Sequence, residues 1–172
     1  MTGKTHITAG ILTGITISAF NHFGFEKTVT YCVISGAAAL IPDIDLVTSK
    51  AGAKIKPISF IINKFFGHRT ICHAPIVYAS IFFLLMSFFP SYSFYIDMIY
   101  FGIFSHLLLD MLNLKGIPLF YPFSRKRYNL ASIKTNGFFE VVFNSILICC
   151  IAFIGYCMLN SIDITSVLTK SQ

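Results

Sequence analysis

Apolar residues form five runs along the chain, and short polar stretches separate these runs. The runs cover residues 7–20, 29–42, 74–90, 95–112 and 138–159. A helix needs roughly 20 apolar residues to cross a bilayer, and the first two runs approach that length only with their flanking Gly, Thr and Ser residues. The pattern predicts an all-α fold: a polytopic integral membrane helical bundle with about five transmembrane helices. Small residues in the first two runs predict close helix packing: Gly10, Gly14, Ser35 and Gly36.

A further helix is predicted in the polar stretch between the second and third runs. Large apolar residues recur there at the i, i+3, i+4, i+7 and i+8 spacing of one helix face: Ile58, Ile61, Ile62, Phe65 and Phe66. Pro57 suits a first helical position. This pattern is typical of an amphipathic helix lying in the cytoplasmic membrane interface. The alternative is a half-re-entrant helix that packs on the bundle.

The composition supports a membrane protein and excludes other classes. Of the 172 residues, 55% are hydrophobic and only 12% are charged, and the mean hydropathy is +0.74. These values exclude a disordered chain and a nucleic-acid-binding tail, and the length suits one membrane-embedded domain over residues 1–172. The net charge of +6 comes from basic residues in loops, so membrane lipids with anionic headgroups are the expected partners, and nucleic acid is not.

The distribution of lysine and arginine predicts the orientation. If the N-terminus is cytoplasmic and five helices cross the membrane, eleven of the 13 basic residues lie on the cytoplasmic side. Only Lys27 and Lys170 then lie outside. Because cytoplasmic loops carry an excess of Lys and Arg, we expect a cytoplasmic N-terminus and an external C-terminus. The odd set of five cysteines has no disulfide or zinc-knuckle spacing, which suits a bacterial inner membrane with reduced thiols.

Most acidic and histidine residues occur at the ends of apolar runs that this orientation places on the cytoplasmic side. They are His6, Asp43, Asp45, His68, His73, His106, Asp110 and Glu140. His106 and Asp110 have the i, i+4 spacing of one helix face. Asp43 and Asp45 follow Pro42, which breaks the second helix. Eight such groups on one membrane face predict a shared site.

A metal centre explains why these groups are tolerated beside hydrocarbon. Burying ionisable groups there is costly unless their charge is compensated, and two divalent cations would cancel the four carboxylates of the set. A mixture of imidazole and carboxylate favours zinc, with manganese or iron as alternatives, over calcium. The competing interpretation is a buried ion-pair network without metal, in which Lys4 and Arg69 neutralise the carboxylates.

Several motifs, in this order, resemble those of a known family. They are Gly3-Lys4-Thr5-His6, Ile41-Pro42-Asp43-Ile44-Asp45, His68-Arg69 with His73, His106-Leu107-Leu108-Leu109-Asp110, and the stretch from Gly116 to Phe123. Together they resemble the bacterial membrane-bound metal-dependent hydrolases, also described as LexA-binding, inner-membrane-associated hydrolases. The resemblance implies a hydrolase of the inner membrane whose ligands are the seven His and Asp residues of the set. It departs at Cys72-His73-Ala74, where the family has Thr-His-Ser, and before Glu140, where Thr135-Asn136-Gly137 replaces Thr-Gly-Ser.

The expected reaction is hydrolysis by a metal-activated water at the cytoplasmic membrane face. A second metal ion would hold the oxygens of a phosphoester. Asp45 or Glu140 would act as the base, and the fork of Arg69 would bind a phosphate. A lipid or lipid-linked phosphoester is the expected substrate, since the site lies at headgroup level. The alternatives are a metal transporter or sensor, and a non-catalytic scaffold with a structural metal.

Overall fold

The computed structural model describes residues 1–49, 52–66 and 70–162, and this part of the chain contains helices and loops but no strand. The α-helices are α1 Gly3–Phe20, α2 Phe25–Ala38, α3 Lys56–Phe66, α4 Pro75–Phe88, α5 Ser93–Met111 and α6 Phe138–Leu159. Short 3-10 helices are η1 Pro42–Asp45, η2 Gly52–Ile55, η3 Ile71–His73 and η4 Pro90–Tyr92. The all-α prediction is confirmed, and each of the five apolar runs and the amphipathic stretch forms one α-helix.

Two helical segments of the described residues are long and apolar enough to cross a membrane. They are Pro90–Met111, which joins η4 to α5, and α6. α4 is apolar but shorter, while α1 has 18 residues and α2 has 14. The five-span arrangement is therefore not confirmed by helix length and composition, although the five helices are present.

Small residues bring α1, α2 and α5 into close contact, as the sequence pattern predicts. A Cβ atom on Gly10 would lie 2.6 Å from the carbonyl oxygen of Ser35, and a Cβ on Gly102 would meet the same oxygen. The hydroxyl of Ser35 donates a hydrogen bond to the carbonyl oxygen of Gly10 at 2.8 Å. Because only glycine leaves room for these backbones, the three helices form the tight centre of the fold.

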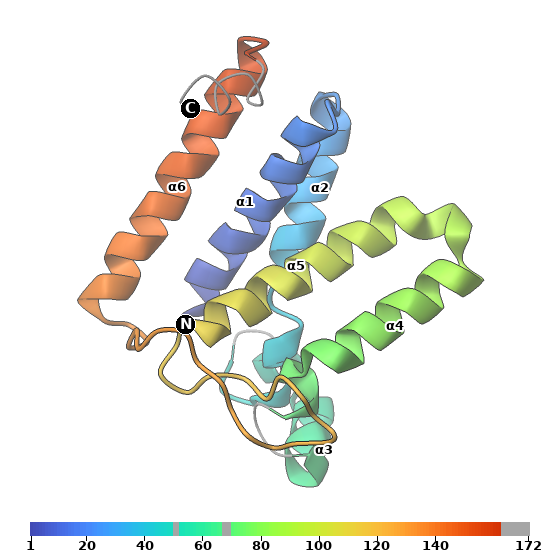
Figure 1. The fold of residues 1–172 in the computed structure, drawn as a ribbon, viewed down its shortest axis with the longest axis vertical. Helices are drawn as coiled ribbons and strands as arrows, with labels where there is room; N and C mark the ends of the chain where they lie inside the picture. Colours follow the sequence, from blue (N-terminus) through green and yellow to red (C-terminus); the bar gives the residue numbers. More distant parts are fainter. Residues whose placement is uncertain (50–51, 67–69, 163–172) are drawn as a thin grey trace.

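Figure 1 shows how the other helices surround this centre. α6 runs alongside α1, and α4 and α5 form a hairpin that crosses the direction of α1 and α2. The start of α1, the end of α2, the start of α4, the end of α5 and the start of α6 all lie at the end of the molecule that also carries α3. We call this end the site end.

The loop between α5 and α6, residues 112–137, folds back on itself at the site end. Isolated bridges join Asn113 to Ile133 and Ile117 to Tyr128. Gly116 has φ +58°, and a Cβ there would clash with the carbonyl of Tyr128, so this tight turn requires glycine. The loop is thereby fixed to the end of α5, next to the ionisable residues.

α3 contacts the site end through polar side chains. The hydroxyl of Ser59 donates to the carbonyl oxygen of Ile44 at 2.6 Å, and the amide of Asn63 donates to the carbonyl oxygen of Asp45 at 2.9 Å. Ile58, Ile61 and Phe65 remain 52%, 53% and 74% exposed. An amphipathic helix that packs by its polar side and exposes its apolar side agrees with the interfacial interpretation.

Candidate metal centre

Local breaks in the helices bring the candidate ligands together at the site end. α2 ends at Ala38, and Pro42 opens the short η1 turn that carries Asp43 and Asp45. His73 closes η3, just before Pro75 begins α4. His6 lies in the first turns of α1, while His106 and Asp110 lie in the last turns of α5.

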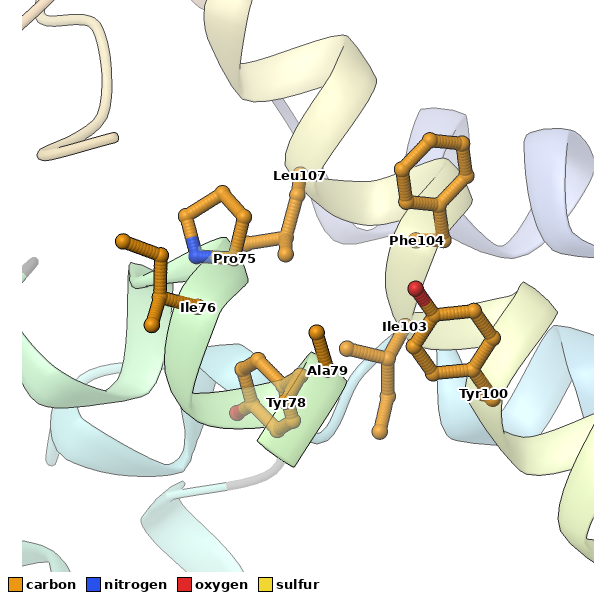
Figure 2. A pocket seen from close by; sticks show the side chains of 8 residues that line it. All are labelled: Pro75, Ile76, Tyr78, Ala79, Tyr100, Ile103, Phe104 and Leu107. Carbon is orange, nitrogen blue, oxygen red and sulfur yellow. The ribbon is translucent and has the colours of Figure 1, made fainter. Parts of the chain in front are cut away.

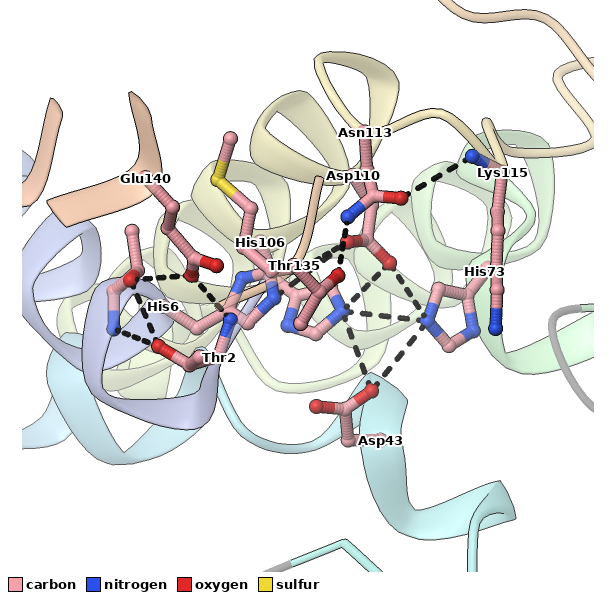
Figure 3. A network of polar contacts seen from close by, with 12 residues as sticks. Thr2, His6, Asp43, His73, His106, Asp110, Asn113, Lys115, Thr135 and Glu140 are labelled. Atoms are coloured by element: carbon pink, nitrogen blue, oxygen red, sulfur yellow. Dashed lines mark hydrogen bonds and ion pairs between the residues drawn. The ribbon is translucent and has the colours of Figure 1, made fainter. Parts of the chain in front are cut away.

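Four donor atoms from three elements face one another (Figure 3). Nε2 of His73 lies 3.3 Å from Nε2 of His106 and 3.3 Å from Oδ2 of Asp110. Oδ1 of Asp43 lies 3.8 Å from Nε2 of His73 and 3.9 Å from Nε2 of His106. Nε2 of His106 lies 3.6 Å from Oδ2 of Asp110. We call Asp43, His73, His106 and Asp110 the four-donor centre.

The spacing of these donors fits a transition metal. Four ligands bound tetrahedrally to zinc at about 2.0–2.1 Å lie roughly 3.3 Å from one another. The five donor distances given above, 3.3–3.9 Å, are close to that value. Two imidazoles and two carboxylates also suit zinc, manganese or iron better than calcium.

The other ring nitrogens of the two histidines of the centre face oxygen atoms. Nδ1 of His106 lies 2.7 Å from the carbonyl oxygen of Ala39. A carbonyl only accepts, so Nδ1 carries the proton and Nε2 keeps its lone pair for a metal. Nδ1 of His73 faces Oδ2 of Asp45 at 3.6 Å. The structure therefore places Asp45 behind His73, where a carboxylate orients an imidazole, and outside the four-donor centre.

His6 extends the site along α1. Its ring is fully buried and stacks on His106, with 3.8 Å between the ring centroids. Neither ring nitrogen has a hydrogen-bond partner among the described residues; Oδ1 of Asp110 lies 3.6 Å from Nε2. Such a buried imidazole without hydrogen bonds is costly, and a bound metal would relieve the cost. His6, His106 and Asp110 form one possible metal-binding group, and Asp43, His73 and His106 form another, so that the two groups share His106.

The electrostatic field of the site favours positive charge. Burial opposes protonation of His73, but hydrogen bonds and charges of Asp110 and Asp45 outweigh it, so the pKa of His73 is raised above its usual value. The same carboxylates would attract a divalent cation. Burial, aided by Asp45, raises the pKa of Cys72 to about 12, and Cys72 belongs to neither possible metal-binding group of the described residues.

Glu140 lies outside both possible metal-binding groups. Its carboxylate accepts hydrogen bonds from the backbone nitrogen of Thr2, the hydroxyl of Thr5 and the backbone nitrogen of Asn136. It thereby ties the start of α6 to the start of α1, and its roles as ligand and base stay predictions. His68 and Arg69 lie outside the described residues, so their roles stay predictions too.

Sequence reasoning missed the partners that position the ligands. The carbonyl of Ala39 is a backbone group with no signature in the sequence. Thr2 and Thr5 bind Glu140 from a position 135 or more residues away along the chain. The nitrogen of Met1, which lies 3.0 Å from Oδ1 of Asp110, was also not expected at the site. Only proximity in the folded chain identifies such contacts.

Comparison with known proteins supports the membrane part of the resemblance. The chain is 36% identical over 141 residues to the uncharacterized protein YvsG of Bacillus subtilis (strain 168), covering 81% of this chain and 85% of that protein. It is 37% identical over 98 residues to the inner membrane protein YdjM of Escherichia coli (strain K12), covering 53% of this chain and 48%, about half, of that protein.

The family assignment rests on a longer match than either relative gives. No solved structure matches the chain, and the descriptions of these relatives name no hydrolase activity and no binding to LexA. The model of the family described as YdjM inner membrane protein matches residues 1–167, which include every residue of the four-donor centre. The chain therefore belongs to the YdjM inner membrane protein family.

Proposed function

We propose that this protein is a metal-dependent hydrolase of the bacterial inner membrane that cleaves a phosphoester or lipid-linked substrate at the cytoplasmic face. The observation that carries the proposal is the four-donor centre, whose donors come from η1, η3 and α5. Three of its side chains are fully buried, while that of Asp43 is 17% exposed. A metal bound there is reachable from one side, as a catalytic site requires and a sealed structural site does not.

The proposed membrane arrangement has five crossing helices with the site end in the cytoplasm. The helix ends that carry the ligands gather at one end of the molecule. The loop between α5 and α6 adds basic residues at that end: Lys115, Arg125, Lys126, Arg127 and Lys134. An excess of basic residues marks cytoplasmic segments. The family description and the name of the E. coli relative support the inner membrane.

Asp43, His73 and His106 would hold the first metal ion and leave its fourth position for water, with Asp110 beside them. The bound metal would act as a Lewis acid and lower the pKa of a coordinated water to about 7. Asp45 would position His73 through Nδ1, and Ala39 would position His106. The carboxylate of Asp43 lies on the accessible side, where its second oxygen can accept a proton from an incoming water. A second ion would use His6 and Oδ1 of Asp110 together with donors outside the four-donor centre.

A phosphate-bearing substrate suits the charge of the site end. The basic residues of the loop between α5 and α6 would attract an anionic head and raise its local concentration. Arg69 follows the predicted ligand His68 in the sequence and would bind the phosphate bidentately. A substrate at the membrane surface would meet the metal centre from the side of Asp43.

The alternatives use the same ligands without hydrolysis. A transporter needs polar groups along a path through the membrane, whereas the two possible metal-binding groups of the described residues lie together at the site end. A metal sensor or a scaffold with a structural metal would bind the ion and release no product. Turnover therefore separates these functions from a hydrolase.

The test combines metal content with turnover on one preparation of purified protein. Bis(p-nitrophenyl) phosphate, p-nitrophenyl phosphate and phosphatidic acid would serve as substrates, with zinc, manganese or iron added to metal-free protein. We expect metal-dependent release of product that is lost in His73→Ala and kept in His22→Asn. His22 is exposed and has φ 51°, a conformation that asparagine tolerates. Stoichiometric metal without turnover on any substrate would reject the hydrolase.

A further inference from the structure

An apolar pocket lies between α4 and α5, beside the four-donor centre. Its volume is about 190 Å³, and its walls include Pro75, Tyr78, Ala79, Tyr100, Ile103 and Leu107. Figure 2 shows Pro75 and Leu107 at one end of the pocket and Tyr100 near the other. The volume equals that of roughly six liquid water molecules, so the pocket has room for a segment of an aliphatic chain.

Two residues that line the pocket are close in the sequence to members of the four-donor centre. Leu107 directly follows His106 on α5, and Pro75 lies two residues after His73. The end of the pocket formed by Pro75 and Leu107 is therefore only one or two residues along the backbone from His106 and His73. A lipid whose chain filled the pocket would have its head within reach of that centre.

The wall of the pocket formed by α4 lies at the exposed surface of the protein. α4 contains no buried residue, and Phe83 and Leu84 on it are 71% and 52% exposed. In a membrane protein, such a helix is surrounded by acyl chains. The hydroxyl of Tyr78 donates a hydrogen bond to the carbonyl oxygen of Cys72 at 3.1 Å, and the ring of this tyrosine lines the pocket. An aliphatic chain can enter from the bilayer without crossing water.

We infer that this pocket binds the aliphatic chain of a phosphate-bearing lipid whose head lies at the metal centre, an inference that rests on the proposed function. The chain leaves one apolar environment for another, so it gains little hydrophobic free energy on entry. Selectivity must then come from the head, through the metal and the basic loop between α5 and α6. A lipid with the same chains and a different head should occupy the pocket less.

Photo-crosslinking tests this inference without requiring turnover. Two lipid probes carry the same diazirine in the middle of an acyl chain. One probe is the phosphonate analogue of phosphatidic acid, and the other is phosphatidylcholine. Each is added to metal-loaded protein in vesicles of unlabelled phosphatidylcholine. The phosphonate has a P–C bond in place of the ester bond, so hydrolysis cannot consume it. We expect adducts on residues 75–79 and 100–107, at least five times more from the phosphonate than from phosphatidylcholine.

Two variants at Ala79 fill the pocket, and one variant on α4 is the matched control. Ala79→Leu and Ala79→Phe should lower the pocket adduct at least fivefold, whereas Leu84→Phe, which adds a similar ring to the exposed surface, should keep it. Thermal unfolding and metal content identify a variant that fails to fold. In that case the comparison of the two probes on the wild-type protein still tests the inference. Equal labelling by both probes, or adducts unchanged in a folded Ala79 variant, would overturn the inference.

The result also separates this inference from the proposed function. A selective pocket adduct with no turnover on any phosphoester would reject the hydrolase and support the lipid site. Turnover on soluble phosphoesters without a selective pocket adduct would reject the lipid site and leave the hydrolase intact.

Discussion

The side chain of His106 reaches from α5 to the end of α2, where its Nδ1 donates a hydrogen bond to the carbonyl oxygen of Ala39 at 2.7 Å. This bond fixes both the tautomer and the orientation of the ring. The lone pair of Nε2 then faces His73, Asp43 and Asp110. The backbone at the end of one helix thus orients a candidate metal ligand on another helix.

Loss of the imidazole of His106 should weaken metal binding strongly. Loss of a group that only positions a ligand lowers metal affinity roughly 10–100-fold. We expect His106→Ala to lower the affinity for zinc by more than this, because the variant removes a donor atom of the four-donor centre. Elemental analysis and zinc titration of purified protein measure the change. His22→Asn should bind as the wild type does, and equal metal in both variants would favour an ion-pair network without metal.

Asp45 should act on metal affinity through His73. Asp45→Asn keeps the size of the side chain and removes the charge that faces Nδ1 of His73. We expect an affinity roughly 10–100-fold below that of the wild type, with unchanged metal stoichiometry at saturation. Zinc titration distinguishes the two quantities, and a lower stoichiometry at saturation would instead identify Asp45 as a direct ligand.

Glu140 should affect stability more than metal content. Glu140→Gln turns an amide donor toward the backbone N–H of Asn136 or of Thr2, both of which donate to the carboxylate. We expect a loss of about 1.5–3 kcal/mol in the free energy of unfolding, typical of a charge-assisted hydrogen bond. Thermal unfolding in detergent and metal analysis test this. Loss of metal at unchanged stability would restore Glu140 as a ligand.

Close packing of α5 on α2 gives a prediction that is independent of the metal. Gly102→Ala would push a Cβ into the backbone carbonyl of Ser35, and overpacking of this kind costs about 1–3 kcal/mol. Gly24→Ala is the matched control, since no atom lies within 4 Å of its added Cβ and its φ is −65°. Thermal unfolding should show a lower Tm for Gly102→Ala alone; equal Tm values would contradict this packing.

The proposed orientation can be tested by cysteine labelling in a variant without the five native cysteines. Lys27 lies near the start of α2 and Lys126 in the loop at the site end, and both are exposed. A membrane-impermeant maleimide added to intact cells should label Lys27→Cys and spare Lys126→Cys until the cells are opened. Labelling of both from outside would reject the cytoplasmic site end.

The sequence by itself determined the helices and the side of the molecule on which the ligands gather. Runs of apolar residues specify helices because unpaired backbone groups are not tolerated in hydrocarbon. The i, i+4 spacing of His106 and Asp110 already placed them on one face of α5. The amphipathic pattern of residues 58–66 identified α3, since a period of 3.6 residues is a local property.

Only the tertiary structure decided which of these residues meet and what each one does. Asp43 and Asp45 are two residues apart, yet one faces the four-donor centre and the other lies behind His73. Glu140 shares the site end but is bound by Thr2, Thr5 and Asn136. These roles depend on distances between helices that are remote in the sequence, and those distances are set by close contacts such as Gly102 against Ser35. Residue type and spacing specify local geometry, whereas the packing of whole helices determines which oxygen or nitrogen reaches the centre.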